Sequence, residues 1–243
     1  MKQLMLAIAA VIFITVGSTA QNNQIPLIGS EAPSFKAMST NGKINFPDDF
    51  GKQWKILFSH PADFTPVCTS ELLELAYLQP KFKELGVECA VISRDGVETH
   101  KLWVKQLEGL DYRNRGPQAI EFPLIEDTQL KVSEKYGMLH KPTSTNRDIR
   151  GVFIIDGNNI VRSVNFYPME VGRNMNEIVR LIEAIQTTDE SMVYTPANWE
   201  KGDDVILPYY PFSKAESDLS AEEKEGYYPM GNRVWFKEVS KDK

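Results

Sequence analysis

Short apolar runs alternate with longer segments of helical periodicity through the first three quarters of this chain. Residues 54–59 and 87–93 have the length and composition of buried strands. Between them, apolar side chains recur at helical spacing over residues 69–85, and Gly86 is typical of a C-cap. We expect Pro80 to kink or split this helix, because proline has no N–H to donate.

The same pattern predicts further elements downstream. A helix is expected over residues 98–110, with Leu102, Trp103 and Leu107 on one face. The others are a strand over 122–125, a helix over 128–136, and two strands over 151–156 and 160–167 that Gly157-Asn158-Asn159 joins as a hairpin.

The order of these elements predicts an α/β domain over residues 24–186. Strands and helices alternate three times, and a hairpin and a last helix follow, the helix beginning at an Asn174–Glu177 capping box. This order implies a central mixed sheet with helices on both faces. Residues 187–243 are rich in Pro, Tyr and charged side chains, so we expect this extension to pack on the first domain or on a second subunit. Its strand-like pieces are 204–207 and 233–236.

The N-terminus has the features of a secretory signal peptide over residues 1–20. Lys2 gives a positive start, residues 4–16 are apolar, and Ser18 and Ala20 fit the small residues of a cleavage site. Thirteen apolar residues are few for a bilayer span. We therefore expect an exported protein, periplasmic or secreted, cleaved near Ala20; the alternative is an uncleaved N-terminal anchor.

Composition and charge limit the classes of molecule that this protein is expected to bind. The net charge is −6, and it becomes −7 without the leader, whose only charged residue is Lys2. This acidic balance argues against a nucleic-acid partner and against stable association with an anionic membrane surface. Two cysteines are too few for a disulfide scaffold, and histidines forty residues apart have no zinc-type spacing, so we expect no metal and no cofactor.

Cys68 is the candidate for chemistry. It follows a strand and a proline-bounded loop and stands where a long helix begins. Unpaired amides and the helix dipole stabilise a thiolate at such a position, and the thiolate is the nucleophile. The alternative is a buried packing cysteine, although the flanking prolines and threonine do not suit an apolar plug.

The residues around Cys68 resemble the active-site motif of the peroxiredoxins, Pro61-x-x-x-Thr65-x-x-Cys68. The extended match to their one-cysteine (peroxiredoxin-6-like) branch is Ser59-His60-Pro61-x-Asp63-Phe64-Thr65-Pro66-Val67-Cys68-Thr69. Gly172-Arg173-Asn174 and Thr195-Pro196-x-x-Trp199-x-x-Gly202-Asp203 resemble the same branch, so the similarity runs over residues 28–208. It implies a thioredoxin-like fold with a small C-terminal dimerisation extension, and a thiol-dependent peroxidase.

The resemblance also implies roles for single residues. Thr65 would orient the peroxide, Pro61 would shield the site from water, and the backbone amides around Val67 and Cys68 would complete the pocket. The family's arginine, which holds the thiolate and the peroxide, falls at Arg150, seventeen residues before Tyr167-Pro168. Arg147 is the competing candidate, and we prefer Arg150 because it adjoins the following strand directly.

Supporting residues follow from the same resemblance. Glu71, one helical turn after Cys68, would pair with site arginines, of which Arg173 is the second; the alternative for Glu71 is an acid that complements the helix dipole. His60 would lie beside the pocket, either as a base or in packing. His100 and His140 are expected to be ordinary surface or core histidines.

Two departures from relatives refine the prediction. No cysteine follows Cys89, so the C-terminal resolving cysteine of two-cysteine peroxiredoxins is missing, and we expect Cys89 to be buried in a strand rather than to resolve a disulfide. The stretch Gly51-Lys52-Gln53-Trp54-Lys55 lacks the serine of a lipase-like motif, so we expect no phospholipase activity.

The sequence therefore predicts a peroxidase in which Cys68 reduces hydrogen peroxide or organic hydroperoxides through a sulfenic acid. An external thiol, a thioredoxin-like protein or a small thiol, would restore it, and a homodimer or larger homo-oligomer is expected. The alternatives are a disulfide oxidoreductase on the same fold, a cysteine hydrolase using Cys68 and His60, and a holdase-type chaperone.

Overall fold

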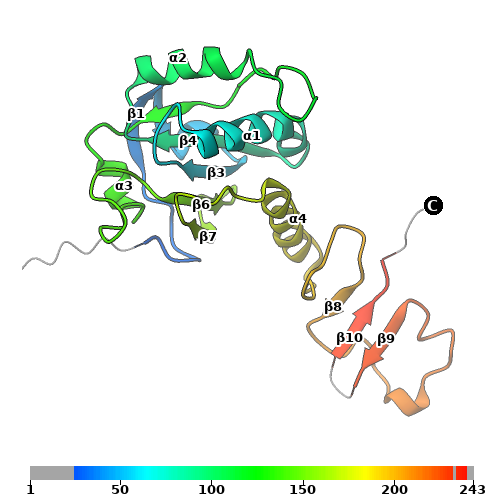
Figure 1. The fold of residues 1–243 in the computed structure, drawn as a ribbon. Helices are drawn as coiled ribbons and strands as arrows, with labels where there is room; N and C mark the ends of the chain where they lie inside the picture. Colours follow the sequence, from blue (N-terminus) through cyan, green and yellow to red (C-terminus); the bar gives the residue numbers. More distant parts are fainter. Residues whose placement is uncertain (1–24, 232–233, 240–243) are drawn as a thin grey trace, which may run out of the picture.

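Strands and helices alternate along residues 25–231 and 234–239, the part of the chain that the computed structural model describes (Figure 1). The strands are β1 (Phe35–Ser39), β2 (Gly42–Phe46), β3 (Trp54–Ser59), β4 (Val87–Ser93), β5 (Leu124–Glu126), β6 (Arg150–Ile155), β7 (Val161–Tyr167), β8 (Val205–Leu207), β9 (Tyr227–Met230) and β10 (Val234–Lys237). The helices are α1 (Pro66–Glu84), α2 (Val97–Leu107), α3 (Lys131–Lys135) and α4 (Met175–Ser191), with 3₁₀ turns at Asp48–Phe50 and Glu216–Asp218. The expected signal peptide, residues 1–20, lies outside the described residues.

A seven-stranded mixed sheet is the centre of the larger part of the molecule. Its strand order is β2-β1-β5-β4-β3-β6-β7. β3, β4 and β5 run parallel, whereas β6 pairs antiparallel with β3 and with β7. Parallel strands need crossover connections, which α1 and α2 supply. The mixed sheet that the element order predicts is therefore present.

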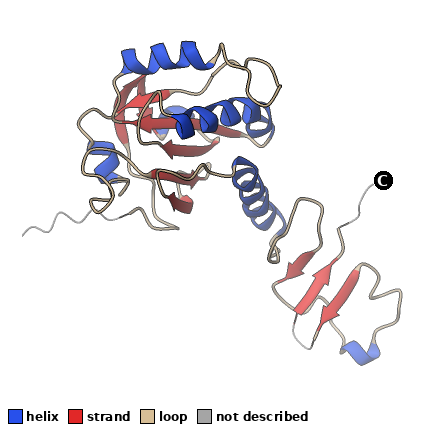
Figure 2. Cartoon of the chain, in the orientation of Figure 1, coloured by secondary structure: helices blue, strands red, loops and turns tan. Residues whose placement is uncertain are grey.

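Helices lie around the strands of this sheet (Figure 2), and apolar side chains pack on both of its faces. On one face, residues of α1, α2 and α4 pack on the central strands, among them Leu72, Trp103 and Ile182. On the other face, the β1–β2 hairpin and α3 enclose a second layer that includes Phe46 and Tyr136. Strands buried on both faces explain the continuous apolar runs of β3 and β4 in the sequence.

Pro80 lies inside α1, and the helix neither splits nor ends there. A proline at this position leaves the carbonyl of Ala76 without its helical donor. The side-chain amide of Gln79 donates to that oxygen at 3.0 Å and replaces the missing N–H. Of the two predicted effects of Pro80, a kink or a split, the split does not occur, and the neighbouring side chain satisfies the exposed carbonyl.

Other differences from the predicted elements have local causes. Leu102 is 66% exposed, while Trp103 and Leu107 are buried, so the apolar face of α2 does not include it. The β1–β2 hairpin was not predicted, although Asn41-Gly42 at its turn is a hairpin signal. The helix expected over residues 128–136 is confined to Lys131–Lys135.

The C-terminal extension is a small unit at the far end of α4, away from the large sheet (Figure 1). Its sheet has the order β8-β10-β9. Ala184 of α4 packs with Val193, Trp199 and Val205, so the end of α4 supplies part of the apolar contact. Of the strand-like pieces in this segment, 204–207 contains β8, and 233–236 overlaps β10 apart from Arg233, which lies outside the described residues. The strand β9 was not predicted.

Asp148 is fully buried just before β6, on the side of the sheet that α3 covers. Neither carboxylate oxygen has a hydrogen-bond partner among the described residues. Burial raises the pKa of Asp148 to about 8; the carboxylates of Asp127 and Asp95 add to the rise, and the Ser133 side chain opposes it. Folded protein therefore keeps a proton here that the unfolded chain releases near pH 4.

We expect Asp148→Asn to change how stability depends on pH. Between about pH 4 and pH 8 the folded state binds the extra proton, so the free energy of unfolding of the wild type falls by up to about 1.4 kcal/mol per pH unit from this group. The asparagine variant lacks this decrease, so its free energy of unfolding increases relative to that of the wild type as the pH rises. Urea unfolding at several pH values measures the effect.

The matched control is Asp127→Asn. The Asp127 carboxylate accepts hydrogen bonds from the Ser133 amide at 2.7 Å and from its hydroxyl at 2.6 Å. This variant should lose stability at every pH in the range. Parallel stability curves for Asp148→Asn and wild type would contradict the assignment to Asp148.

Candidate active site

Cys68 lies in the first turn of α1 and is fully buried. Pro66 occupies the first helical position, where its fixed φ suits the helix and its missing N–H costs nothing. The preceding Thr65 is extended, and its hydroxyl donates to the carbonyl of Ala62 at 2.9 Å. Within the described chain, no side chain caps this end of α1, so the helix presents its first-turn amides and positive dipole end beside the thiol.

Arg150, the first residue of β6, contacts the thiol directly. Its Nη1 lies 3.3 Å from Cys68 Sγ and 2.6 Å from Glu71 Oε2. Its Nε and Nη2 both donate to the carbonyl of Met169, at 2.9 and 2.5 Å. The planar guanidinium is thus fixed by three groups, and one N–H side faces the sulfur.

The end of β3 holds the Arg150 backbone in place. Ser59 Oγ donates to the carbonyl of Ile149 at 2.7 Å and accepts from the amide of Gly151 at 2.8 Å. A Cβ on residue 151 would lie only 2.9 Å from that oxygen, so glycine is needed for the close approach. The residues on both sides of Arg150 are therefore hydrogen-bonded to Ser59 of β3, which fixes the backbone where β6 begins.

Glu71 joins the two arginines. Its Oε1 accepts from the Arg173 amide at 2.8 Å and from Nε at 2.9 Å, while Oε2 accepts from Arg173 Nη2 at 2.7 Å and from Arg150. Arg173 also donates from Nη1 to the carbonyls of Ser59 and Gly151. The structure brings together the four residues that the sequence singled out for this network.

The four buried side chains of this network include more positive than negative charge. Cys68, Glu71, Arg150 and Arg173 are all at most 7% exposed. Burial alone would raise the pKa of Glu71, but Arg173 and then Arg150 hold that pKa below its usual value. Two guanidiniums against one carboxylate leave one positive charge uncompensated, and buried charges need partners. Cys68 Sγ lies 3.3 Å from the Arg150 guanidinium, beside this excess of positive charge.

Pro61 lies in the loop between β3 and α1, and Val67 is the second residue of α1. Pro61 is buried beside His60, and Val67 is partly exposed in the first turn of α1. Arg147, the competing arginine, is exposed on the loop before β6. The geometry thus favours Arg150 over Arg147 as the thiolate partner.

His60 is buried against the aromatic ring of Trp103. The two rings stack with centroids 5.3 Å apart. Burial lowers the pKa of His60 to about 4, although the Asp63 carboxylate opposes the shift. A neutral imidazole of such low basicity is a weak proton acceptor at neutral pH, so the environment favours a packing role over a base role.

Sequence reasoning missed the pair formed by Asp63 and His100. His100 is fully buried in α2, and its Nδ1 lies 2.7 Å from Asp63 Oδ2. His100 was expected to be an ordinary histidine, because 37 positions separate it from Asp63 and nothing in the sequence connects the two. Asp63 stands inside the motif, yet its polar side chain gave no indication of its partner. The carbonyl of Met169, which fixes Arg150, was equally invisible in the sequence.

Cys89 is buried in β4, as the sequence predicted. Burial raises the pKa of its thiol, and the neighbouring Glu88 adds to this. It lies beside Phe82 and Lys83, at the opposite end of α1 from Cys68. With a rise of 1.5 Å per residue, the fourteen residues from Cys68 to Phe82 span about 21 Å.

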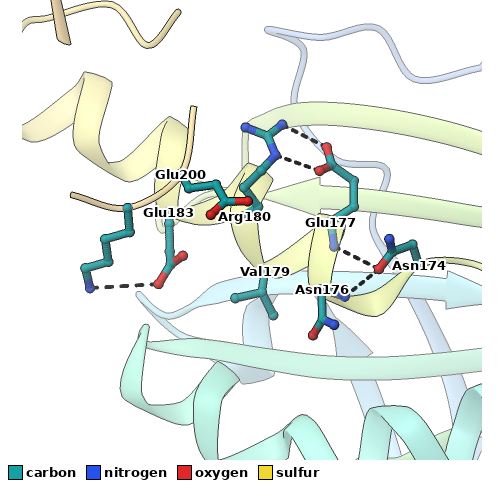
Figure 3. Close-up of a pocket in the computed structure, with 8 residues that line it drawn as sticks. Asn174, Asn176, Glu177, Val179, Arg180, Glu183 and Glu200 are labelled. Atoms are coloured by element: carbon teal, nitrogen blue, oxygen red, sulfur yellow. Dashed lines mark hydrogen bonds and ion pairs between the residues drawn. The ribbon is translucent and has the colours of Figure 1, made fainter. Parts of the chain in front are cut away.

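A polar groove of about 420 Å³ lies near the site, along α4 (Figure 3). At its end the Asn174 side chain accepts from the amides of Asn176 and Glu177, as predicted for a helix N-cap. The Glu177 carboxylate pairs with Arg180 instead of reaching back to complete the capping box. The predicted catalytic residues do not line this groove.

In residues 25–231 and 234–239, no group of three or more His, Cys, Asp or Glu side chains is arranged to hold a metal ion. Over the same residues, no helix combines the length and apolar character that crossing a bilayer requires.

Comparison with known proteins gives consistent results. The model of the AhpC/TSA family matches residues 28–164, and that of the C-terminal domain of 1-Cys peroxiredoxin matches residues 184–218. A peroxiredoxin of Methanosarcina mazei is 43% identical over 219 residues, which cover 90% of this chain and 99% of the relative.

Two solved structures resemble the fold over nearly its whole length. A mutant of peroxiredoxin 6 from Arenicola marina has a TM-score of 0.73 and 34% identity, covering 89% of this chain and 99% of the other. A yeast mitochondrial 1-Cys peroxiredoxin, studied for thiol resolution through the glutathione and thioredoxin systems, has a TM-score of 0.72 and 36% identity, covering 88% and 99%. The chain therefore belongs to the peroxiredoxins of the AhpC/TSA family, and it is a peroxidase with the thioredoxin-like fold that its sequence predicted.

Proposed function

We propose that Cys68 is the peroxidatic residue and reduces hydrogen peroxide and organic hydroperoxides. The observation that carries this proposal is the Arg150 guanidinium, 3.3 Å from Sγ and bonded to Glu71. It places a fixed positive charge where a thiolate reacts and where an oxygen leaves with developing negative charge. Thr65 directly precedes α1, and in this proposal its hydroxyl and the first-turn amides of the helix orient the peroxide.

The reaction proceeds in one displacement. The Cys68 thiolate attacks the terminal oxygen of the hydroperoxide, an S–O bond forms, and the O–O bond breaks. The other oxygen leaves as hydroxide or alkoxide and takes a proton to become water or an alcohol. Sulfur loses two electrons and becomes a sulfenic acid.

An external thiol completes the cycle in this proposal. The about 21 Å along α1 between Cys68 and the surroundings of Cys89 far exceeds the Cα separation of a disulfide, about 4.4–6.8 Å. The same separation counts against a disulfide oxidoreductase that would use both thiols. A thioredoxin-like protein or a small thiol is the reductant we propose, in keeping with the systems named for the yeast relative.

A homodimer or larger homo-oligomer is also part of this proposal. β7 is the last strand of the large sheet, and after Val161, which bonds to Gly29 and Ser30, no described strand pairs with its outer edge. The C-terminal unit extends away from this sheet with Tyr194, Tyr209 and Met230 exposed. Exposed strand edges and apolar side chains are typical interfaces. Light scattering after gel filtration should give at least twice the chain mass; a monomer at micromolar concentration would contradict this proposal.

Export remains the localisation we propose, on the basis of residues 1–20 alone. A protein recovered from expression of the full sequence should begin near Gln21. The intact mass of that protein reports the cleavage directly, and an uncleaved chain in the membrane fraction would favour the anchor instead.

The decisive experiment is oxidation followed by intact-mass measurement. A small excess of hydrogen peroxide should add one oxygen atom to the chain, and a sulfenic-acid reagent should trap it at Cys68. Cys68→Ser should abolish peroxide consumption, while Cys89→Ser should leave it unchanged. Loss of two hydrogen atoms, or activity retained by Cys68→Ser, would overturn the proposed mechanism.

Arg150→Ala should slow the oxidation of Cys68 by about 100-fold or more, the usual effect of removing one charge-stabilising donor. Arg150→Lys should recover only part of the rate, because an ammonium cannot bond Glu71, Met169 and the sulfur in one plane. The exposed Arg147→Ala is the matched control and should oxidise at the wild-type rate. Stopped-flow measurement of the second-order rate constant distinguishes the three variants.

A further inference from the structure

The loop that leads into α1 contains an unusual backbone conformation. Phe64 has a φ of 57°, in the left-handed region that a bulky aromatic residue rarely adopts. Its side chain is 50% exposed, and its ring centroid lies 6.1 Å from that of Trp103 in α2. Thr65 follows directly, and its orientation therefore depends on whatever fixes the backbone at position 64.

Asp63, on the other side of Phe64, is the anchor of the loop. It is 7% exposed, its amide donates to Asp95 Oδ2 at 2.8 Å, and its carboxylate faces His100. Asp95 is itself held by Ser93 at the end of β4, whose hydroxyl lies 3.1 Å from the same oxygen. Backbone and side chain of Asp63 are thus both bound to elements outside the loop.

His100 provides the second half of this anchor. Its Nδ1 lies 2.7 Å from Asp63 Oδ2, and its Nε2 lies 3.3 Å from the carbonyl of Ile125 in β5. Both partners are hydrogen-bond acceptors, one a carboxylate of the loop and the other a main-chain carbonyl of β5. A histidine placed only for packing has no need of two aligned acceptors from two different elements.

A hydrogen bond within the loop connects Thr65 to the segment that Asp63 anchors. The Thr65 hydroxyl donates to the carbonyl of Ala62, so the turn from Ala62 to Thr65 is bonded across Phe64. With its hydrogen used in this way, the hydroxyl oxygen offers its remaining lone pairs to a donor such as the O–H of a hydroperoxide. The direction of those lone pairs depends on the conformation of the Ala62–Thr65 turn. Asp63, held by His100, fixes that conformation.

We propose that His100 is a positioning residue for the peroxidase reaction: through Asp63 it holds the left-handed Phe64 and thereby the Thr65 hydroxyl that orients the peroxide. This inference rests on the proposed role of Cys68 and Thr65. It assigns no chemistry to His100 itself, which acts through Asp63.

Two substitutions of His100 separate the hydrogen bond from the space that the ring fills. In His100→Asn the amide nitrogen lies near the former Nδ1 and can still donate to Asp63. In His100→Gln it lies near the former Nε2 and turns away from Asp63. His100→Gln should lower the second-order rate constant of Cys68 oxidation by hydrogen peroxide at least about tenfold, as expected when an orienting group is displaced. His100→Asn should restore most of that rate.

Alkylation of Cys68 by iodoacetamide in the same variants reports the thiolate without using Thr65. It should stay at the wild-type rate in His100→Gln and in His100→Asn. Equal losses in oxidation and alkylation would overturn the proposal, because His100 would then act on the thiolate or on the fold as a whole. His140→Gln, in a half-exposed histidine outside the loop, is the matched control.

A double variant tests whether the effect passes through Thr65. In a Thr65→Val background the hydroxyl is already missing, so adding His100→Gln should cost less than about twofold in oxidation rate. A full additional loss in that background would overturn the proposal, as would unchanged oxidation in single His100→Gln protein with lowered thermal stability. Absence of peroxide consumption by the wild type would instead refute the proposed function itself, so the two failures are distinguishable.

Discussion

The shared carboxylate of Glu71 is the interaction on which the site depends. Two buried guanidiniums this close to each other repel, and a single carboxylate with all its acceptor positions filled is what lets both remain. Removing one member of such a buried cluster commonly destabilises a protein by about 3–5 kcal/mol, since it leaves a charge without a partner. The cluster also joins α1, the start of β6 and the segment before α4, so its geometry and the packing of these elements are set together.

The sheet supplies the rigidity that this cluster needs. The Ser59 hydroxyl at the end of β3 donates to the carbonyl of Ile149 and accepts from the amide of Gly151, the residues on either side of Arg150. Arg173 donates to the carbonyls of Ser59 and Gly151. A helix terminus, two strand ends and a loop therefore meet at one edge of the sheet. Pre-organised charges of this kind need no rearrangement when the reaction begins.

Much of this arrangement could be predicted from the sequence, and the limits have physical causes. Apolar periodicity identified β3, β4, α1 and the β6–β7 hairpin because burial determines those residues. The resemblance to the peroxiredoxins indicated Glu71, Arg150 and Arg173, because the family has residues of these types at the corresponding positions. The sequence did not show that α1 continues through Pro80, because a side chain, that of Gln79, donates to the carbonyl of Ala76 in place of the backbone. His100 was missed because its partner is distant in sequence, and only the packing of α2 against the loop brings it to Asp63.

The balance of charge around Cys68 has a consequence for the second half of the proposed cycle. While the sulfur is a thiolate, two positive and two negative side chains cancel. Conversion to a neutral sulfenic acid removes one negative charge and leaves the two arginines in excess over Glu71. The oxidised site then attracts an incoming anion, and the reactive form of a reductant is a thiolate. In the proposed cycle, the same side chains thus serve the oxidant while the site is neutral and the reductant once the site has become positive.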